Sequence, residues 1–129
     1  MTTAPGNEDG HYSGLVQPIH VSNVHCAPDY HIGTILAYLS RYRKKGGALD
    51  LKKSIWFVNQ LRTCEFDPKP FKWMSSFGAV DLTSEIYVAV AQLVYAACQD
   101  YDSRCLFYDT AIDILRSILL NEYGERYEK

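Results

Sequence analysis

The chain has 129 residues, 47% of them hydrophobic and 22% charged, and its formal net charge is −2. A chain of this size and composition forms one globular domain that buries a core of its own. The longest apolar run is too short to cross a membrane, and the low net charge argues against binding to duplex nucleic acid, which requires a basic face. The polar segment 1–10 carries no export signal, so we expect a cytoplasmic protein with no membrane partner.

Segment 1–10 is predicted to be disordered, and residues 11–129 to form a single domain that starts with an irregular N-terminal segment. A helix is predicted from Pro28 to Lys45, because apolar residues recur at the spacing i, i+3, i+4 and i+7: Ile32, Ile35, Leu36 and Leu39. Another side of this helix carries hydroxyls, rings and cations at steps of three or four: Tyr30, Thr34, Tyr38, Arg41 and Lys45. We take this side as the wall of a candidate site.

The stretch from Arg41 to Lys53 is the most informative part of the chain, because it sets six basic residues against one acid, Asp50, around the pair Gly46–Gly47. The glycines join two helical patterns and would bring the cations together at one corner: Arg41, Arg43, Lys44, Lys45, Lys52 and Lys53. Mobile cations, a glycine backbone and the N-terminus of a helix together favour the binding of phosphate. The alternative is a solvated basic loop that caps both helices.

A second helix is predicted over 49–63, followed by a connector rich in proline and aromatic residues at 64–80. Two more helices are predicted, one from 81 or 83 to 99 and one over 102–124, and the tail 123–129 is expected to be mobile. These last two helices are apolar on most sides, which predicts a hairpin that packs against a neighbouring subunit. The expected fold is therefore an all-α bundle of about four helices in a homo-oligomer. Alternatively, the two apolar helices are simply central in a monomer.

Other familiar sites receive little support from the sequence. Four widely spaced cysteines without a C-x-x-C pair are expected to be free thiols: Cys26, Cys64, Cys98 and Cys105. The residues His20, His25, Cys26 and His31 lie close together but fit no standard zinc spacing, so no metal site is predicted. The P-loop, dinucleotide-binding and hydrolase-elbow motifs do not occur.

A combined pattern extends over residues 11–62: His11-Tyr12, Gln17-Pro18-Ile19, Val21, Gly33 to Arg41, Lys44 to Gly47, Asp50 to Lys53 and Trp56. In these residues the chain resembles a small phage family that is catalogued mainly as a domain of unknown function. The characterised kind in that family is a nucleotide kinase that acts on deoxynucleoside monophosphates without a P-loop. The resemblance makes 11–65 the region of the nucleotide-family motif and leaves 66–129 as connector and helical hairpin, where we expect oligomerisation.

The resemblance implies a nucleotide ligand in the cytoplasm of the host cell, with no obligatory cofactor, although a magnesium ion is compatible with the chemistry. It points to His11 and Arg41 as candidate catalytic residues, His11 as proton carrier or phosphate donor and Arg41 as a charge-neutralising group. Asp50 binds a ribose hydroxyl or a base edge, or alternatively only occupies the first turn of its helix. The candidate ligand-binding residues are Tyr12, Tyr30, Thr34, Tyr38, Arg41, Arg43, Lys44, Lys45, Gly46, Gly47, Asp50 and Lys53.

Three functions are consistent with this sequence. The first is a nucleoside monophosphate kinase. The second is a non-catalytic sponge that sequesters a nucleotide signal of host immunity. The family usually has asparagine and lysine where this chain has Thr34 and Ala37, and the missing lysine favours recognition over phosphoryl transfer, which depends on charge neutralisation. The third is a protein-interaction module that uses the acidic C-terminal helices.

Overall fold

The computed structural model describes residues 28–68 and 84–127. All regular structure within these residues is helical, and they contain no strand, which confirms the predicted all-α class. The expectations for the N-terminal segment and for most of the connector lie outside the described residues, and with them His11, Tyr12 and three of the four clustered His and Cys residues, His20, His25 and Cys26. The predicted oligomer stays a prediction.

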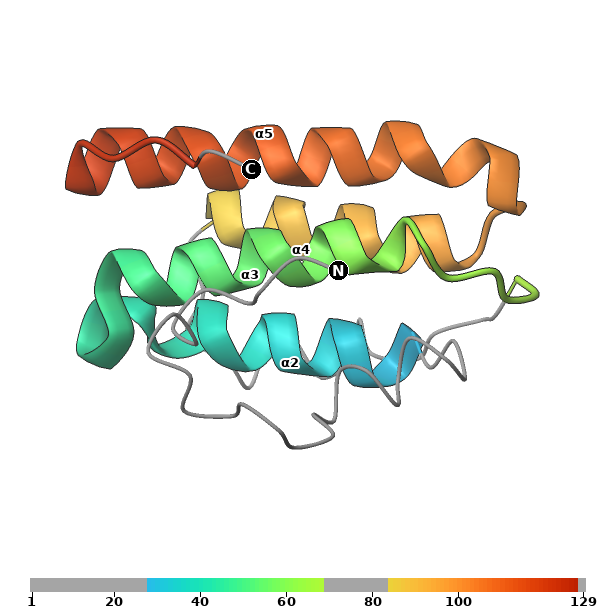
Figure 1. Ribbon diagram of the computed structural model, residues 1–129, viewed down its shortest axis with the longest axis horizontal. Helices are drawn as coiled ribbons and strands as arrows, with labels where there is room; N and C mark the ends of the chain where they lie inside the picture. Colours follow the sequence, from blue (N-terminus) through green and yellow to red (C-terminus); the bar gives the residue numbers. More distant parts are fainter. Residues whose placement is uncertain (1–27, 69–83, 128–129) are drawn as a thin grey trace, which may run out of the picture.

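Helices α2 (Pro28–Arg41) and α3 (Gly47–Leu61) lie side by side and run in opposite directions (Figure 1). We expected the first helix to continue to Lys45, but the regular α-helix ends at Arg41 and passes into the π-helical turn η1 (Tyr42–Gly46). Tyr42 is buried in this turn, whereas the three basic residues that follow it are exposed. The wider turn therefore lets one ring enter the core while its neighbours stay in water.

The second half of the chain forms α4 (Ser84–Ala97), the short 3-10 turn η3 (Tyr101–Ser103) and α5 (Arg104–Tyr123). Gly124 ends α5 in the left-handed conformation (φ 67°), and its N–H donates to the carbonyl of Leu120 at 2.9 Å, as the glycine in the sequence predicts. The expected mobile tail is described up to Tyr127, whose side chain is half-buried against the core. Burial of this ring fixes the end of the chain against the bundle.

One core holds the bundle together, because α2 contacts α3 and α4, and α5 contacts α3 and α4. Each helix contributes completely buried aliphatic side chains, among them Ile35, Leu51, Val90 and Leu115. Within each helix the buried side chains recur mostly at steps of three or four residues, as the sequence shows. On α4 the burial is incomplete, since Val88 and Tyr95 remain 46% and 48% exposed. No helix in the described ranges is both long and apolar enough to span a bilayer.

Arg104 is a buried charged residue that the sequence did not indicate. Its Nε donates to the carbonyls of Ala96 and Gln99 at 3.1 and 3.0 Å, and its Nη2 donates to the carbonyl of Phe66 at 2.8 Å. The guanidinium also lies 3.7 Å from the centre of the Phe66 ring. Arg104 thus donates to carbonyls at and just beyond the end of α4, and it fixes the segment after α3 to the start of α5.

Candidate anion-binding site

The polar side predicted for the first helix lines a shallow groove in the structure. Tyr30, Thr34, Tyr38 and Arg41 surround it together with Gly33 and Ala37, and its volume is about 400 Å³. These residues lie on successive turns of α2 and therefore share one face. Lys45, which we expected on the same face, is not among the residues that line the groove, because the π-helical turn intervenes between it and α2.

Tyr38 forms a platform for two cations at one end of the groove. Arg41 places its guanidinium carbon 5.0 Å from the centre of the Tyr38 ring, and the Nζ of Lys53, which comes from α3, lies 5.4 Å from the same point. Phe57 supports the Tyr38 ring from the core at a centroid distance of 5.9 Å. Two helices thus bring two cationic side chains to one aromatic ring, which holds each cation without neutralising its charge.

Asp50 holds Arg41 in this position. The Nε of Arg41 donates to Oδ2 of Asp50 at 3.3 Å, and the Asp50 side chain is buried while the Arg41 side chain is 49% exposed. Because Nε is occupied by this bond, the terminal amino groups of the guanidinium are the part that remains for a ligand. This placement favours the structural alternative for Asp50, a carboxylate in the first turn of α3 that orients Arg41.

Both glycines of the corner have a specific reason to be glycine. A Cβ atom built on Gly46 would lie 1.9 Å from the carboxylate carbon of Asp50. Gly47 has φ 56°, a conformation that side chains disfavour. We expected the glycine backbone to allow close approach of an external anion, and in the structure the anion packed against Gly46 is the carboxylate of Asp50 itself.

The six cations do not converge on one point as the sequence suggested. Arg41 lines the groove and Lys53 lies against the Tyr38 ring, whereas Arg43 and Lys52 contact acidic residues from the C-terminal end of the chain. Nη2 and Nε of Arg43 donate to Glu122 at 2.7 and 3.2 Å, and Nζ of Lys52 donates to Glu125 at 2.6 Å. The corner therefore has an inner side at the groove and an outer side at the C-terminus.

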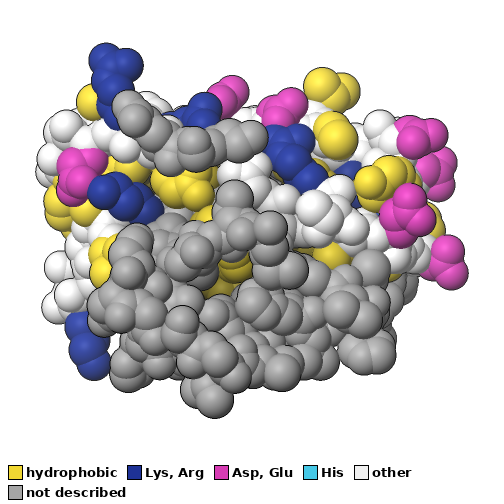
Figure 2. All heavy atoms as spheres, in the orientation of Figure 1, with side chains coloured by type: hydrophobic (Ala, Val, Ile, Leu, Met, Phe, Trp, Pro, Cys, Tyr) yellow, Lys and Arg dark blue, Asp and Glu magenta, His cyan; other side chains and the backbone are white. Residues whose placement is uncertain are grey.

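Lys44 and Lys45 are exposed on η1 and form no ion pair within the described part of the chain. Acidic side chains gather at the end of the molecule opposite the corner (Figure 2), where Glu65, Asp100 and Asp102 are exposed. Positive charge that is not paired is thus concentrated near η1 and the groove, which favours the approach of an anion to this end.

The ion pair of Glu122 makes stability depend on pH. Its hydrogen bond with Arg43 holds the pKa of Glu122 below the ordinary value of 4.5, so the pair stabilises the fold fully above that value and ceases to do so as the pH falls through the lowered pKa. We expect Glu122→Gln to reduce the free energy of unfolding at neutral pH by about 0.5 kcal/mol, as for other exposed pairs. Urea unfolding of both proteins over a pH series should show this difference vanish in acid. A difference that stays constant down to the lowest pH would contradict the assignment.

Tyr42 supports the same contact. Burial raises the pKa of Tyr42 to about 12, with the nearby Glu122 carboxylate as a second cause. The phenol is therefore protonated at neutral pH, and its hydroxyl donates to the two carboxylate oxygens of Glu122 at 3.3 and 3.4 Å. Glu122 accordingly accepts hydrogen bonds from a guanidinium fork and a phenol at once.

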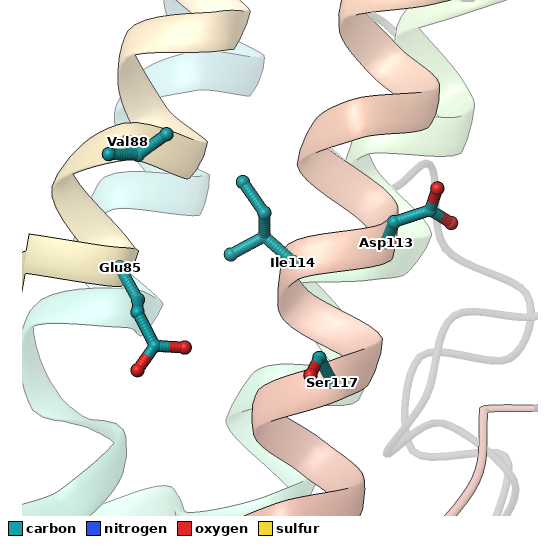
Figure 3. Close-up of a pocket in the computed structure, with 5 residues that line it drawn as sticks. All are labelled: Glu85, Val88, Asp113, Ile114 and Ser117. Atoms are coloured by element: carbon teal, nitrogen blue, oxygen red, sulfur yellow. The ribbon is translucent and has the colours of Figure 1, made fainter.

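A second groove, of about 430 Å³, lies between α4 and α5. Ile114 points from α5 toward α4, Glu85 extends from α4 into the gap, and Asp113 points away from α4 (Figure 3). Val88 and Ser117 complete the lining, so this groove offers carboxylates and apolar surface but no cation. Carboxylates repel phosphate, and the groove on α2 is therefore the better candidate for an anionic ligand.

His31 belongs to the core. It is fully buried, with its ring edge-on to the rings of Tyr30 and Phe57. In the segments that the structure describes, no three His, Cys, Asp or Glu residues are grouped so that they could hold a metal ion.

Comparison with known proteins covers the first part of the chain. Residues 5–59 match the model of a family described as a protein of unknown function, DUF3310. This confirms the resemblance to a domain of unknown function, and the matched residues include α2, η1 and nearly all of α3. Searches of the curated proteins and of the solved structures found no match to the chain. The groove and the cations of the corner thus lie within the matched domain, whereas α4, α5 and the acids that contact the outer side of the corner lie beyond it.

Proposed function

We propose that the protein binds a nucleotide in the groove on α2, with a phosphate group at Arg41 and Lys53. The observation that carries this proposal is the pair of cations on one Tyr38 ring at the end of a groove lined by hydroxyl groups. Arg41 offers a planar fork that suits two phosphate oxygens, and Lys53 adds a point charge next to the same ring. Exposed Lys44 and Lys45 raise the local concentration of anionic ligands.

The groove also suits the remaining parts of a nucleotide. Tyr30 is 40% exposed at the end of the groove away from Arg41, which leaves ring surface for a base. Between the two ends, the hydroxyl of Thr34 is available to a sugar hydroxyl. The resemblance to a phage nucleotide kinase supports the same ligand class. If the protein is catalytic, the reaction is transfer of the terminal phosphoryl group of a nucleoside triphosphate to a phosphate oxygen of a deoxynucleoside monophosphate, with Arg41 and Lys53 neutralising charge.

A non-catalytic sponge for a host immune nucleotide is the second candidate, and one observation favours it. The two positions at which this chain departs from the family pattern, Thr34 and Ala37, both line the groove. The change at Ala37 removes a cation from the surface that would face the transferring phosphate, which weakens catalysis more than binding. A site that keeps the phosphate-binding cations Arg41 and Lys53 but lacks the family's lysine at position 37 would hold a nucleotide without converting it.

One experiment tests both candidates. The protein is incubated with a panel of linear and cyclic nucleotides, with and without magnesium, and binding is followed by calorimetry while chromatography detects any chemical change. We expect at least one nucleotide to bind, and its recovery unaltered would favour the sponge over the kinase. The variant Arg116→Ala removes an exposed cation from α5, far from the groove in the sequence. It controls for a general effect of lost positive charge and should bind like the wild type. Absence of binding across the panel would overturn the proposal and leave the protein-interaction role.

A further inference from the structure

The outer side of the corner is covered by a short segment that we call the clasp, consisting of Glu122, Tyr123, Gly124 and Glu125. Figure 1 shows the C-terminal end of α5 beside the turn that joins α2 to α3. The Tyr123 ring lies edge-on to Tyr42 at 6.4 Å, and it is the nearest group to the position that a Cβ on Gly47 would take, at 3.7 Å. The left-handed Gly124 lets the chain turn after α5, and Glu125 then pairs with Lys52. The clasp thus places two carboxylates on two cations, and the aromatic residue between them in the sequence packs against the corner.

The donors beneath the clasp match a phosphate group as well as they match a carboxylate. Nε and Nη2 of Arg43 form a parallel fork, and the hydroxyl of Tyr42 adds a third donor toward the same anion. Planar forks of this kind bind phosphate in bidentate geometry. Lys52 supplies a further charge beneath the clasp, through its contact with Glu125.

The clasp is held by contacts that an external anion can replace. The side chains of Arg43 and Glu122 are 52% and 32% exposed, and those of Lys52 and Glu125 are 31% and 43% exposed. Ion pairs with this exposure are weak, because water screens both partners. A ligand phosphate carries more negative charge than a carboxylate and competes directly for the same donors.

We infer that Arg43, Lys52 and the hydroxyl of Tyr42 form a second phosphate site, which Glu122 and Glu125 occupy until a ligand with a further phosphate group displaces them. The inference rests on the proposed function only in placing the first phosphate at Arg41 and Lys53. A ligand with one phosphate group then uses the inner side alone. A ligand with two or more reaches both sides of the corner and releases the clasp, so the clasp discriminates between ligands by their number of phosphate groups.

The test compares two double variants of the full chain that change the net charge equally. Glu122→Gln with Glu125→Gln removes the carboxylates of the clasp, and Glu85→Gln with Asp113→Asn removes two carboxylates from the groove between α4 and α5. Inorganic pyrophosphate is titrated by calorimetry at constant ionic strength. We expect the clasp variant to bind about five-fold more tightly than the wild type, as the loss of two exposed competing pairs implies, and the control variant to bind like the wild type. Adding Arg43→Ala and Lys52→Ala to the clasp variant should abolish the gain.

Hydrogen exchange gives a second readout of the same event. Saturating pyrophosphate should accelerate exchange in residues 120–127 of the wild type, because displacement of the clasp frees the end of the chain. Equal tightening in both double variants would assign the effect to net charge and overturn the inference. Unchanged or weaker binding by the clasp variant, or no binding of pyrophosphate by either protein, would overturn it as well. Nucleotide binding that depends on Arg41 is judged separately, so the proposed function can stand if the second site fails.

Discussion

Replacing Arg41 with alanine is expected to weaken the binding of a phosphate-bearing nucleotide by about thirty-fold, which corresponds to about 2 kcal/mol for the loss of a charge-assisted hydrogen-bonding fork. Calorimetry with the best ligand from the nucleotide panel measures the effect. The substitution Arg41→Lys keeps the charge but loses the planar fork, and it should fall between alanine and the wild type. Lys45→Ala should weaken binding much less, because Lys45 does not line the groove.

This variant also removes the partner of a buried carboxylate. Asp50 is only 3% exposed, so Arg41→Ala leaves a charge in the core without its ion pair and lowers stability as well as affinity. The double variant Arg41→Ala with Asp50→Asn separates the two effects, since it removes the buried charge while the ligand still lacks the guanidinium. Recovered stability with persistently weak binding would locate the contact with ligand at Arg41. Wild-type affinity in both variants would show that the groove on α2 is not the site.

Replacing Gly46 with alanine is expected to lower the free energy of unfolding by about 3 kcal/mol, through overpacking and the loss of a buried ion pair. The new Cβ would lie within 2 Å of the Asp50 carboxylate, which has little room to move because it is buried. Moving the carboxylate also breaks its bond with Arg41, so ligand binding should decline together with stability. Urea unfolding measures the first effect and calorimetry the second.

Gly124→Ala provides the comparison for that variant. Gly124 has a positive φ, but no other group lies within 4 Å of a Cβ built there, so the substitution carries only the conformational cost of about 1 kcal/mol. A Gly46→Ala protein no less stable than Gly124→Ala would contradict the close packing of Asp50. The pair Gly46→Ala with Asp50→Ala should be less destabilised than the two single costs added together, because the second change removes the group with which the first collides.

Local patterns in the sequence predicted most of the helices and the groove. Apolar spacing located α2 and α5 to within a few residues, and a glycine marked the end of α5. The face formed by Tyr30, Thr34, Tyr38 and Arg41 was predictable because these residues lie on one helix, where spacing alone decides which side chains are neighbours.

Contacts between distant parts of the chain were not predictable in this way. Glu122 is 79 residues from Arg43, and Glu125 is 73 residues from Lys52, so no local pattern could show that these two of the six cations are paired. The acidic excess of the C-terminal residues was the one available signal. It shows that negative charge is present there, but it does not show which cations that charge contacts. Burial of Asp50 and Arg104 depends equally on tertiary packing. The two sides of the corner therefore emerge only when all the helices are in place.

The π-helical turn affects the directions in which the side chains after α2 point. Such a turn holds one residue more than an α-helical turn, and each residue of an α-helix rotates the chain by about 100°. Deleting a single residue between Tyr42 and Gly46 would turn the basic side chains that follow the deletion by about that angle relative to α2. Arg41 precedes the deletion and would stay at the groove, whereas the cations that follow it would point in new directions. At this corner the number of residues matters as much as their identity.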